Sequence, residues 1–269
     1  MLKRYPWTEA TRLACHMEVL RRKPMLQRVF REFHEVLLHL DRRYFGDTPG
    51  ARVELGSGVA PARDVIPDVW VSDVVWAPHL DLVADAHRLP FRAESVRAVY
   101  CQNSFHHFAD PIAFFAELER VLAPGGGAIL IEPYFGPLAT FVYPRLFVEE
   151  TFDKRAPVWG HAGQGPMTGA NQAQSFIVFF RDRRHFQRRF PALELVHHEP
   201  LTNYLRYVAS GGLNFPSLVP AFCEPLLRAV EWLLRPLVSV LALHHVIVLR
   251  KRRDSGPARS LERRLDVAV

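Results

Sequence analysis

The sequence has 269 residues, of which 49% are hydrophobic and 23% are charged, as is typical of a soluble chain that buries the core of one generous α/β domain. The net charge of +6 suits anionic partners, but the basic residues stand in separate clusters at 21–23, 181–184 and 250–253, so we interpret them as solvated surface charge and disfavour a nucleic-acid groove. Three distant cysteines without metal-ligand spacing argue against a disulfide framework or a zinc site and favour a reducing cytoplasm.

The first 48 residues are expected to form a helical extension. No apolar stretch of the signal-peptide kind is visible at the N-terminus. Apolar residues recur at helical spacing across 8–44, and Pro24 divides the pattern into two helices. We expect these helices to pack on a sheet and to form a partial lid.

An α/β core is predicted to follow, because short apolar strands alternate with helices. The spacing from Asp73 to Leu80 is too short for the usual crossover helix, which we therefore expect to be missing there. The glycine-rich run 123–127 is predicted to end a helix and turn into a strand. The predicted strands are 52–55, 69–72 (ending on Asp73), 80–84, 96–101 and 128–131, and the predicted helices are 61–66 and 111–122.

The second half of the chain gives weaker signals. We predict an insertion at about 134–190, which contains a glycine-rich functional loop at 160–173. Two strands, 193–197 and 245–249, are expected to be a closing antiparallel pair, and 225–236 an amphipathic helix. No apolar run reaches the roughly 18 residues of a membrane-spanning helix. The predicted organisation is an extension at 1–48, one domain at 49–250 and a charged flexible tail at 251–269.

The chemistry-bearing motif is the stretch Glu54-Leu-Gly-Ser-Gly-Val-Ala60, directly after the first core strand. Glycines permit a tight turn and a close approach of the backbone to a ligand. Asp73 ends the second strand, where a carboxylate can accept the hydroxyls of a ribose. Asp85-Ala86 follows the third strand, and Arg120-Val-Leu-Ala-Pro-Gly-Gly precedes the fifth.

These four motifs, in this order and spacing, resemble the class I S-adenosylmethionine (SAM)-dependent methyltransferases, in particular the type 11 methyltransferase domain. The likeness covers about residues 50–133. It implies a Rossmann-like, doubly wound, mostly parallel seven-stranded sheet with an antiparallel closing strand, and an enzyme that uses SAM. One departure is Ala60, which stands where the family has a third glycine.

The resemblance also implies roles for individual residues. Gly56, Ser57 and Gly58 would approach the methionine moiety, with Glu54 fixing the loop. Asp73 would hold the ribose, and Asp85 with Ala86 would face the adenine. Gln102 and Asn103 would line the methyl-transfer side.

Two further hypotheses concern the acceptor. His106 and His107, just after the fourth strand, are candidates for a general base, because histidine titrates near neutral pH. Asn171 in the glycine-rich loop is a candidate for substrate binding. The pairs 197–198 and 244–245 have no third ligand nearby in the sequence, so no metal is expected.

Two rival functions remain open. A nicotinamide-dependent oxidoreductase also uses a Gly-x-Gly turn, but its fingerprint asks for a further glycine where this chain has Pro61. A catalytically inactive SAM-binding scaffold would keep the fold and lose the transfer.

The acceptor is predicted by elimination. Base and amide methylation is disfavoured, because the stretch after the fourth strand is Gln-Asn-Ser-Phe and not Asn-Pro-Pro-aromatic. A small molecule, a sugar or a lipid-linked glycan remains, and we favour methylation on oxygen. The amphipathic helix and the basic run that follows suggest possible peripheral contact of 225–253 with the inner face of a membrane, but we favour the alternative that this helix simply covers the sheet.

Overall fold

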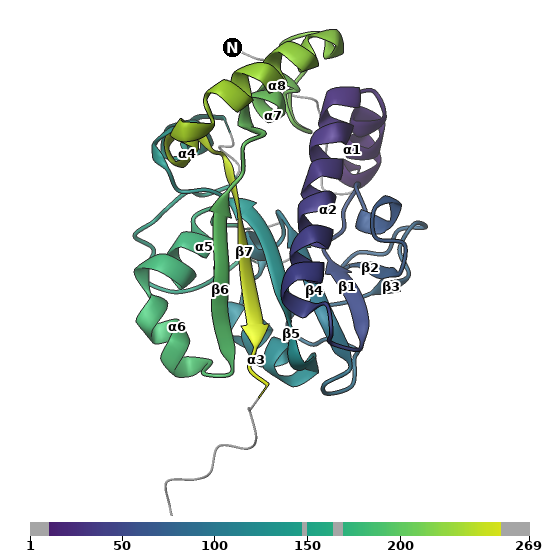
Figure 1. Ribbon diagram of the computed structural model, residues 1–269, viewed down its shortest axis with the longest axis vertical. Helices are drawn as coiled ribbons and strands as arrows, with labels where there is room; N and C mark the ends of the chain where they lie inside the picture. The colour runs from purple at the N-terminus through teal and green to yellow at the C-terminus, as the bar shows by residue number, and fades with distance from the viewer. Residues whose placement is uncertain (1–10, 147–149, 164–168, 254–269) are drawn as a thin grey trace, which may run out of the picture.

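The computed structural model describes residues 11–146, 150–163 and 169–253. Its centre is a seven-stranded sheet in the order β3-β2-β1-β4-β5-β7-β6 (Figure 1). The strands are β1 (Ala51–Leu55), β2 (Val69–Asp73), β3 (Leu82–Val83), β4 (Val96–Gln102), β5 (Leu122–Pro133), β6 (Leu193–Pro200) and β7 (His244–Lys251).

The sheet is parallel from β3 to β5, and β7 pairs antiparallel with both β5 and β6. Alternating strands and helices produced the parallel part, since a parallel pair needs a crossover that leaves the plane of the sheet. The prediction of a doubly wound, mostly parallel sheet with an antiparallel closing strand is confirmed.

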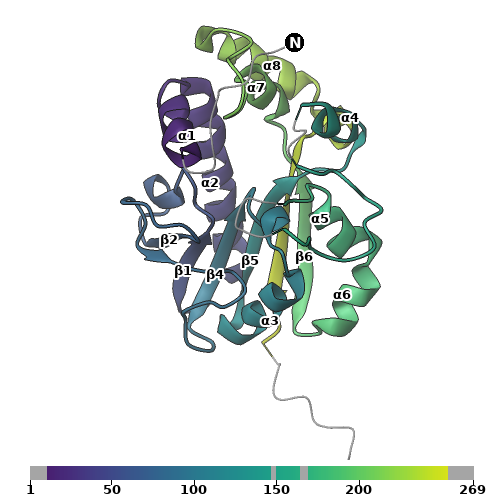
Figure 2. The same ribbon diagram turned by 180° about the vertical axis from the view of Figure 1, so that it is seen from behind.

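Helices cover both faces of this sheet. α1 (Arg12–Arg21) and α2 (Pro24–Phe45) are separate helices, as the position of Pro24 predicted. The apolar side of α2 packs on one face through Phe33 and Leu37 (Figure 1). The other face carries α3 (Pro111–Val121), α5 (Gln174–Phe176) and α6 (Arg183–Arg189) (Figure 2).

The crossover from β2 to β3 is short, as predicted. The structure has turns and no helix across 74–81. Only a 3-10 turn, Ala62–Asp64, joins β1 to β2, although the sequence predicted a short helix over 61–66. This side of the sheet is therefore thinly covered, and the loops after β1, β2 and β3 lie close together.

The glycine run 123–127 departs from its prediction. It does not form a separate turn, because α3 passes directly into β5 at Leu122. A register shift between Val96 and Ala98 absorbs the irregular stretch. At Gly127 an added Cβ would lie 2.0 Å from the carbonyl oxygen of Leu249, so the strand uses glycine for close packing.

The C-terminal part forms a cap above the carboxyl ends of the parallel strands (Figures 1 and 2). Its elements are α4 (Pro137–Leu146), α7 (Tyr204–Ala209), the 3-10 turn Ala221–Cys223, α8 (Glu224–Leu233), the 3-10 turn Arg235–Leu237 and α9 (Val238–Leu241). A π-helical stretch, Ile177–Arg181, precedes α6. Within the described parts of the chain, no helix is both long and apolar enough to cross a bilayer.

The structure separates two features that the sequence joined into one basic, amphipathic surface. α8 belongs to the cap, whereas β7 runs away from the cap and ends at the opposite side of the molecule (Figure 1). Lys251 is buried and donates hydrogen bonds to the carbonyls of Glu119 and Leu122. The basic run 250–253 therefore does not flank α8, and residues 254–269 of the expected tail lie outside the described residues.

Candidate functional site

A cavity of about 520 Å³ opens at the carboxyl ends of β1, β2 and β4, beneath the cap. In an open α/β sheet this edge is where ligands bind, because the loops after the strands converge there. The predicted site residues among its lining residues are Gly56, Ser57, Gly58, Asp73, Asp85, Ala86, Gln102, Asn103, His106 and His107. Glu54 lies beneath the floor.

Glu54 fixes the turn that follows β1, as expected. Its Oε2 accepts hydrogen bonds from the Ser57 hydroxyl at 2.8 Å and from the Ala62 amide at 2.9 Å. The side chain is fully buried, and this burial raises the pKa of Glu54 to about 7 despite the two hydrogen bonds. A positive ligand above the loop would favour its charged form.

The two glycines of this turn are required by geometry. Gly56 has φ +70°, and a Cβ there would lie 2.7 Å from Cβ of Ser104. Gly58 has φ +52°, and apart from its sequence neighbours no atom of the described residues would lie closer than 3.9 Å to a Cβ there. The floor of the cavity is thus bare backbone, which fits a ligand in close contact with the main chain.

Asp73 lies at the edge of this floor. Its Oδ2 accepts the amide of Gly58 at 3.1 Å, and Oδ1 accepts the amides of Val74 at 2.7 Å and Val75 at 3.3 Å. The carboxylate therefore joins the loop after β1 to the loop after β2 and lines the cavity.

Asp85 and Ala86 line the next wall, where the sequence placed them. Asp85 Oδ1 is 2.7 Å from Nδ1 of His87, and Nε2 of His87 accepts the amide of Asp110 at 3.2 Å. His87 therefore carries its proton on Nδ1 and donates it to Asp85. His87 was not among the residues predicted for the site, and only its place directly after this motif in the sequence pointed to it.

Gln102 and Asn103 continue the floor past β4. Asn103 has φ +51°, a left-handed conformation that a non-glycine residue seldom adopts and that often marks a functional turn. The buried Oε1 of Gln102 has no hydrogen-bond partner among the described residues, so it is available to a donor in the cavity.

His106 is anchored by Glu132, a residue that the sequence analysis did not select for the site. The buried carboxylate of Glu132 accepts the backbone amides of Ser104, Phe105 and His106 at 2.9–3.2 Å. It also lies 2.6 Å from Nδ1 of His106. Only its position at the end of β5, next to the loop after β4, could have indicated from the sequence that Glu132 belongs to the site.

Glu150 faces both histidines from the loop after α4. Its carboxylate is 3.5 Å from Nε2 of His106 and 3.7 Å from Nε2 of His107, and Gln172 donates a hydrogen bond to it at 2.6 Å. The three potential ligand atoms lie within 4.8 Å of one another, a spacing that could hold a cation. The expectation of no metal stays a prediction.

Charges in this cluster differ strongly between neighbouring groups. Burial alone would lower the pKa of His106, but the charges of Glu132 and Glu150 and their hydrogen bonds raise it to about 10. Burial and the charged His106 lower the pKa of His107 to about 3. Burial opposes the charge on Glu150, yet the two histidines lower its pKa to about 2. At neutral pH His106 is charged and His107 is neutral.

Asn171 does not line the cavity among the described residues. Its amide oxygen accepts the backbone amides of Asp153 and Ala173, and its nitrogen donates to the carbonyl of Asp153. All of these bonds hold the glycine-rich loop in place. The neighbouring Gln172 lines the cavity instead, while 164–168 of the same loop lie outside the described residues.

The upper wall comes from both ends of the chain. α1 contributes Leu13 and His16, and the loop after α7 contributes Leu213 and Asn214. The N-terminal helices thus pack on the sheet and also cover part of the cavity.

The strand order, the antiparallel β7 and a glycine turn at this edge of the sheet together define the class I methyltransferase arrangement. Residues 68–130 match the family model described as a methyltransferase domain. These residues are therefore those of a methyltransferase domain, as the motifs predicted, and the match disfavours the nicotinamide alternative.

Two curated proteins are similar to part of this chain. A demethylmenaquinone methyltransferase of Deinococcus radiodurans is 43% identical over 63 residues, which cover 23% of this chain and 25% of that protein. An uncharacterized 37.1 kDa protein in transposon TN4556 of Streptomyces fradiae is 35% identical over 72 residues, 27% of this chain and 21% of that protein. The matched stretch thus spans only about a quarter of either relative.

Among solved structures, the YcgJ protein of Bacillus subtilis has a TM-score of 0.44 and 14% identity, covering 82% of this chain and 99% of that chain. Geranyl diphosphate C-methyltransferase of Streptomyces coelicolor has a TM-score of 0.43 and 14% identity, covering 81% and 80%. Because both scores are below 0.5, the assignment of the fold rests on the strand order.

Proposed function

We propose that this protein transfers the methyl group of SAM to a hydroxyl oxygen of a small molecule, a sugar or a lipid-linked glycan. One observation carries the proposal. A single cavity places the bare glycine turn, Asp73 and Asp85 at one end and the His106–His107–Glu150 cluster at the other. The first set suits a nucleoside cofactor, and the second suits an acceptor that loses a proton.

The cofactor side follows from the bonding capacity of each residue. Gly56 and Gly58 leave space for the methionine portion against the main chain, and Asp73 accepts from the ribose. Asp85 and Ala86 face the adenine. Gln102, whose Oε1 is unpartnered among the described residues, accepts a hydrogen bond from the ligand beside Asn103.

SAM, when bound, supplies an activated methyl on a positively charged sulfur. The residues of the chain then need to align the acceptor oxygen and remove its proton. His107 is neutral at physiological pH, so its lone pair can accept this proton, while the charged His106 holds Glu150 in position. The carbon–sulfur bond breaks as the carbon–oxygen bond forms. Because its pKa is lowered to about 3, His107 is too weak a base to deprotonate a free hydroxyl and would take the proton only as methylation makes that hydroxyl acidic.

The acceptor is held, in this proposal, by Gln172 and the wall of the cap, not by Asn171. We also place the protein in the cytoplasm, at the inner face of the membrane where lipid-linked glycans are exposed. The apolar cap next to the cavity supports this placement.

The test has two stages. Calorimetry with SAM and S-adenosylhomocysteine measures binding without any knowledge of the acceptor. Labelled methyl-SAM is then incubated with aqueous and lipid extracts of a strain that lacks the gene, whose metabolites are compared with the parent strain for the loss of one CH₂. Tight binding without transfer to either extract would favour the inactive scaffold, and no binding would refute both functions.

A further inference from the structure

The amphipathic helix α8 has the reverse of the usual orientation of a surface helix. Its acidic residues Glu224 and Glu231 are only 4% and 3% exposed, whereas Leu226, Trp232 and Leu233 on the opposite side are 68–74% exposed. An ordinary surface helix buries the apolar side and exposes the charges. Here the charged side faces the protein.

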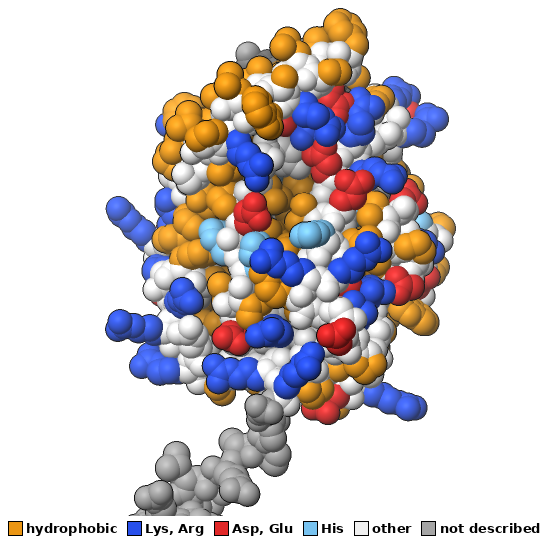
Figure 3. All heavy atoms as spheres, in the orientation of Figure 1, with side chains coloured by type: hydrophobic (Ala, Val, Ile, Leu, Met, Phe, Trp, Pro, Cys, Tyr) orange, Lys and Arg blue, Asp and Glu red, His pale blue; other side chains and the backbone are white. Residues whose placement is uncertain are grey.

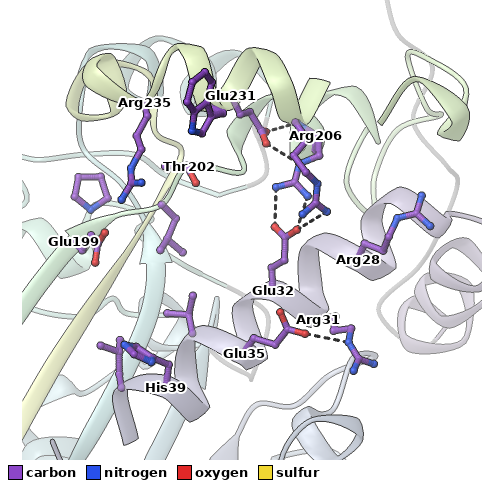
Figure 4. A pocket seen from close by; sticks show the side chains of 16 residues that line it. Arg28, Arg31, Glu32, Glu35, His39, Glu199, Thr202, Arg206, Glu231 and Arg235 are labelled. Atoms are coloured by element: carbon purple, nitrogen blue, oxygen red, sulfur yellow. Dashed lines mark hydrogen bonds and ion pairs between the residues drawn. The ribbon is translucent and has the colours of Figure 1, made fainter. Parts of the chain in front are cut away.

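A buried arginine explains this orientation. Arg206 of α7 donates to Glu231 at 2.6 Å and to Glu32 of α2 at 2.5 and 2.8 Å, and Glu224 lies 3.6 Å away. Figure 4 shows Glu32 and Glu231 both pointing toward Arg206. Turning α8 over would strip Arg206 of its partner Glu231, which is strongly unfavourable for a buried charge. The apolar side is therefore fixed outward.

The exposed apolar side chains form one continuous region at the end of the molecule, which we call the cap surface. Figure 3 shows hydrophobic side chains gathered over α8 at this end. A contiguous exposed apolar patch of this size marks an interaction site. The cap surface consists of Leu218, Phe222, Leu226, Trp232, Leu233, Leu237 and Val240.

The charges at the cap surface have one sign. Between 201 and 241 the sequence has only two acidic residues, Glu224 and Glu231, and both are buried. Arg228 and Arg235 are exposed at its edge, and Arg228 is also paired with Glu32 at 3.0 Å. On neighbouring α4, Arg145 lies 4.0 Å from the ring centre of the exposed Phe141.

We infer that the cap surface docks onto an anionic lipid bilayer, with Phe222 and Trp232 in the interfacial layer and the arginines near lipid phosphates. Aromatic and leucine side chains bordered by arginine are the combination that binds such interfaces. A second copy of the chain fits less well, because a two-fold contact would bring the arginines together, and the two acids of 201–241 are both buried.

Docking in this orientation would also bring the wall of the cavity close to the membrane. The loop between α7 and α8 carries Leu218 of the cap surface and, four residues earlier, Asn214 of the cavity wall. A membrane-embedded acceptor would therefore reach the site from the side of the cap. This last step rests on the proposed function, whereas the docking does not.

Co-sedimentation tests the docking. The full chain is mixed with vesicles of phosphatidylcholine, alone or with phosphatidylglycerol. We expect binding to the mixed vesicles and a loss of about tenfold or more in the double variant Leu226→Gln/Leu233→Gln. Arg235→Gln should weaken binding about fivefold, and only to anionic vesicles. The matched control, Trp70→Gln/Val158→Gln, changes two exposed apolar residues outside the cap surface and should bind as the parent does.

Two results would overturn the inference. One is equal binding by the cap double variant and the control. The other is that the parent chain binds neither kind of vesicle. If sedimentation velocity then shows a dimer that the Leu226→Gln/Leu233→Gln substitutions dissociate, the cap surface is the contact between two copies of the chain. SAM affinity measured in the same variants should stay unchanged, because neither leucine lines the cavity, so a failure of docking is separable from a failure of the methyltransferase.

Discussion

Replacing Asp73 by alanine tests the assignment of the cofactor end of the cavity. An ionised carboxylate has about four acceptor positions. The amides of Gly58, Val74 and Val75 occupy three of them in this structure. One position remains for a ribose hydroxyl, so we expect one strong hydrogen bond from the ribose to Asp73.

The magnitude follows from that count. A single hydrogen bond to a charged group contributes about 1.5–3 kcal/mol, so Asp73→Ala should weaken SAM binding by about ten- to a hundredfold. Calorimetry with SAM and S-adenosylhomocysteine should give the same ratio, because the ribose is common to both.

A matched control separates binding from folding. Asp81 lies after the same strand and accepts the amide of Val71 at 2.9 Å, but it does not line the cavity. Asp81→Ala should therefore lower the melting temperature in the manner of Asp73→Ala and leave SAM affinity intact. Unchanged affinity in Asp73→Ala would mean that the ribose lies elsewhere.

Two further predictions concern the same cavity. Gly58→Val should abolish SAM binding, because the added side chain projects into the ligand's space. The left-handed φ of +52° also strains valine and should lower the melting temperature, so circular dichroism checks that the variant is still folded where binding is measured. Retained binding would contradict the bare floor. The raised pKa of His106 predicts a loss of stability with alkalinity. Because that pKa moves from 6.5 to about 10 on folding, its contribution is complete below pH 6.5 and disappears as the pH rises through about 10. Urea unfolding of the parent should show this decline, and His106→Asn should show less of it.

The sheet was predictable because its signals are local. Apolar runs, the spacing around Pro24 and the missing crossover after Asp73 each depend on neighbours in the sequence. The glycine run before β5 misled for the same reason, since its role is set by Leu249 on a strand more than a hundred residues away.

The lining of the proposed cofactor end was predictable in the same way, because each of its residues lies at or just after the end of a strand. Its acceptor end was not. The two histidines His106 and His107 are surrounded by residues from later parts of the chain. These residues, Glu132, Glu150 and Gln172, come from the end of β5 and from two later loops that lie at the same edge of the sheet. The orientation of α8 likewise depends on Arg206 and Glu32, which no periodicity in α8 reveals.

The junction between the first two helices has a consequence for how the chamber is assembled. The ammonium group of Lys23 has three protons to donate, and it gives them to the carbonyls of Ser210, Gly212 and Phe215. Between those carbonyls lie Leu213 and Asn214 of the cavity wall. One lysine side chain thus ties the loop 210–215, which covers the cavity, to the N-terminal helices. A chain that lacks these helices would keep the floor of the cavity and lose part of the wall that closes it.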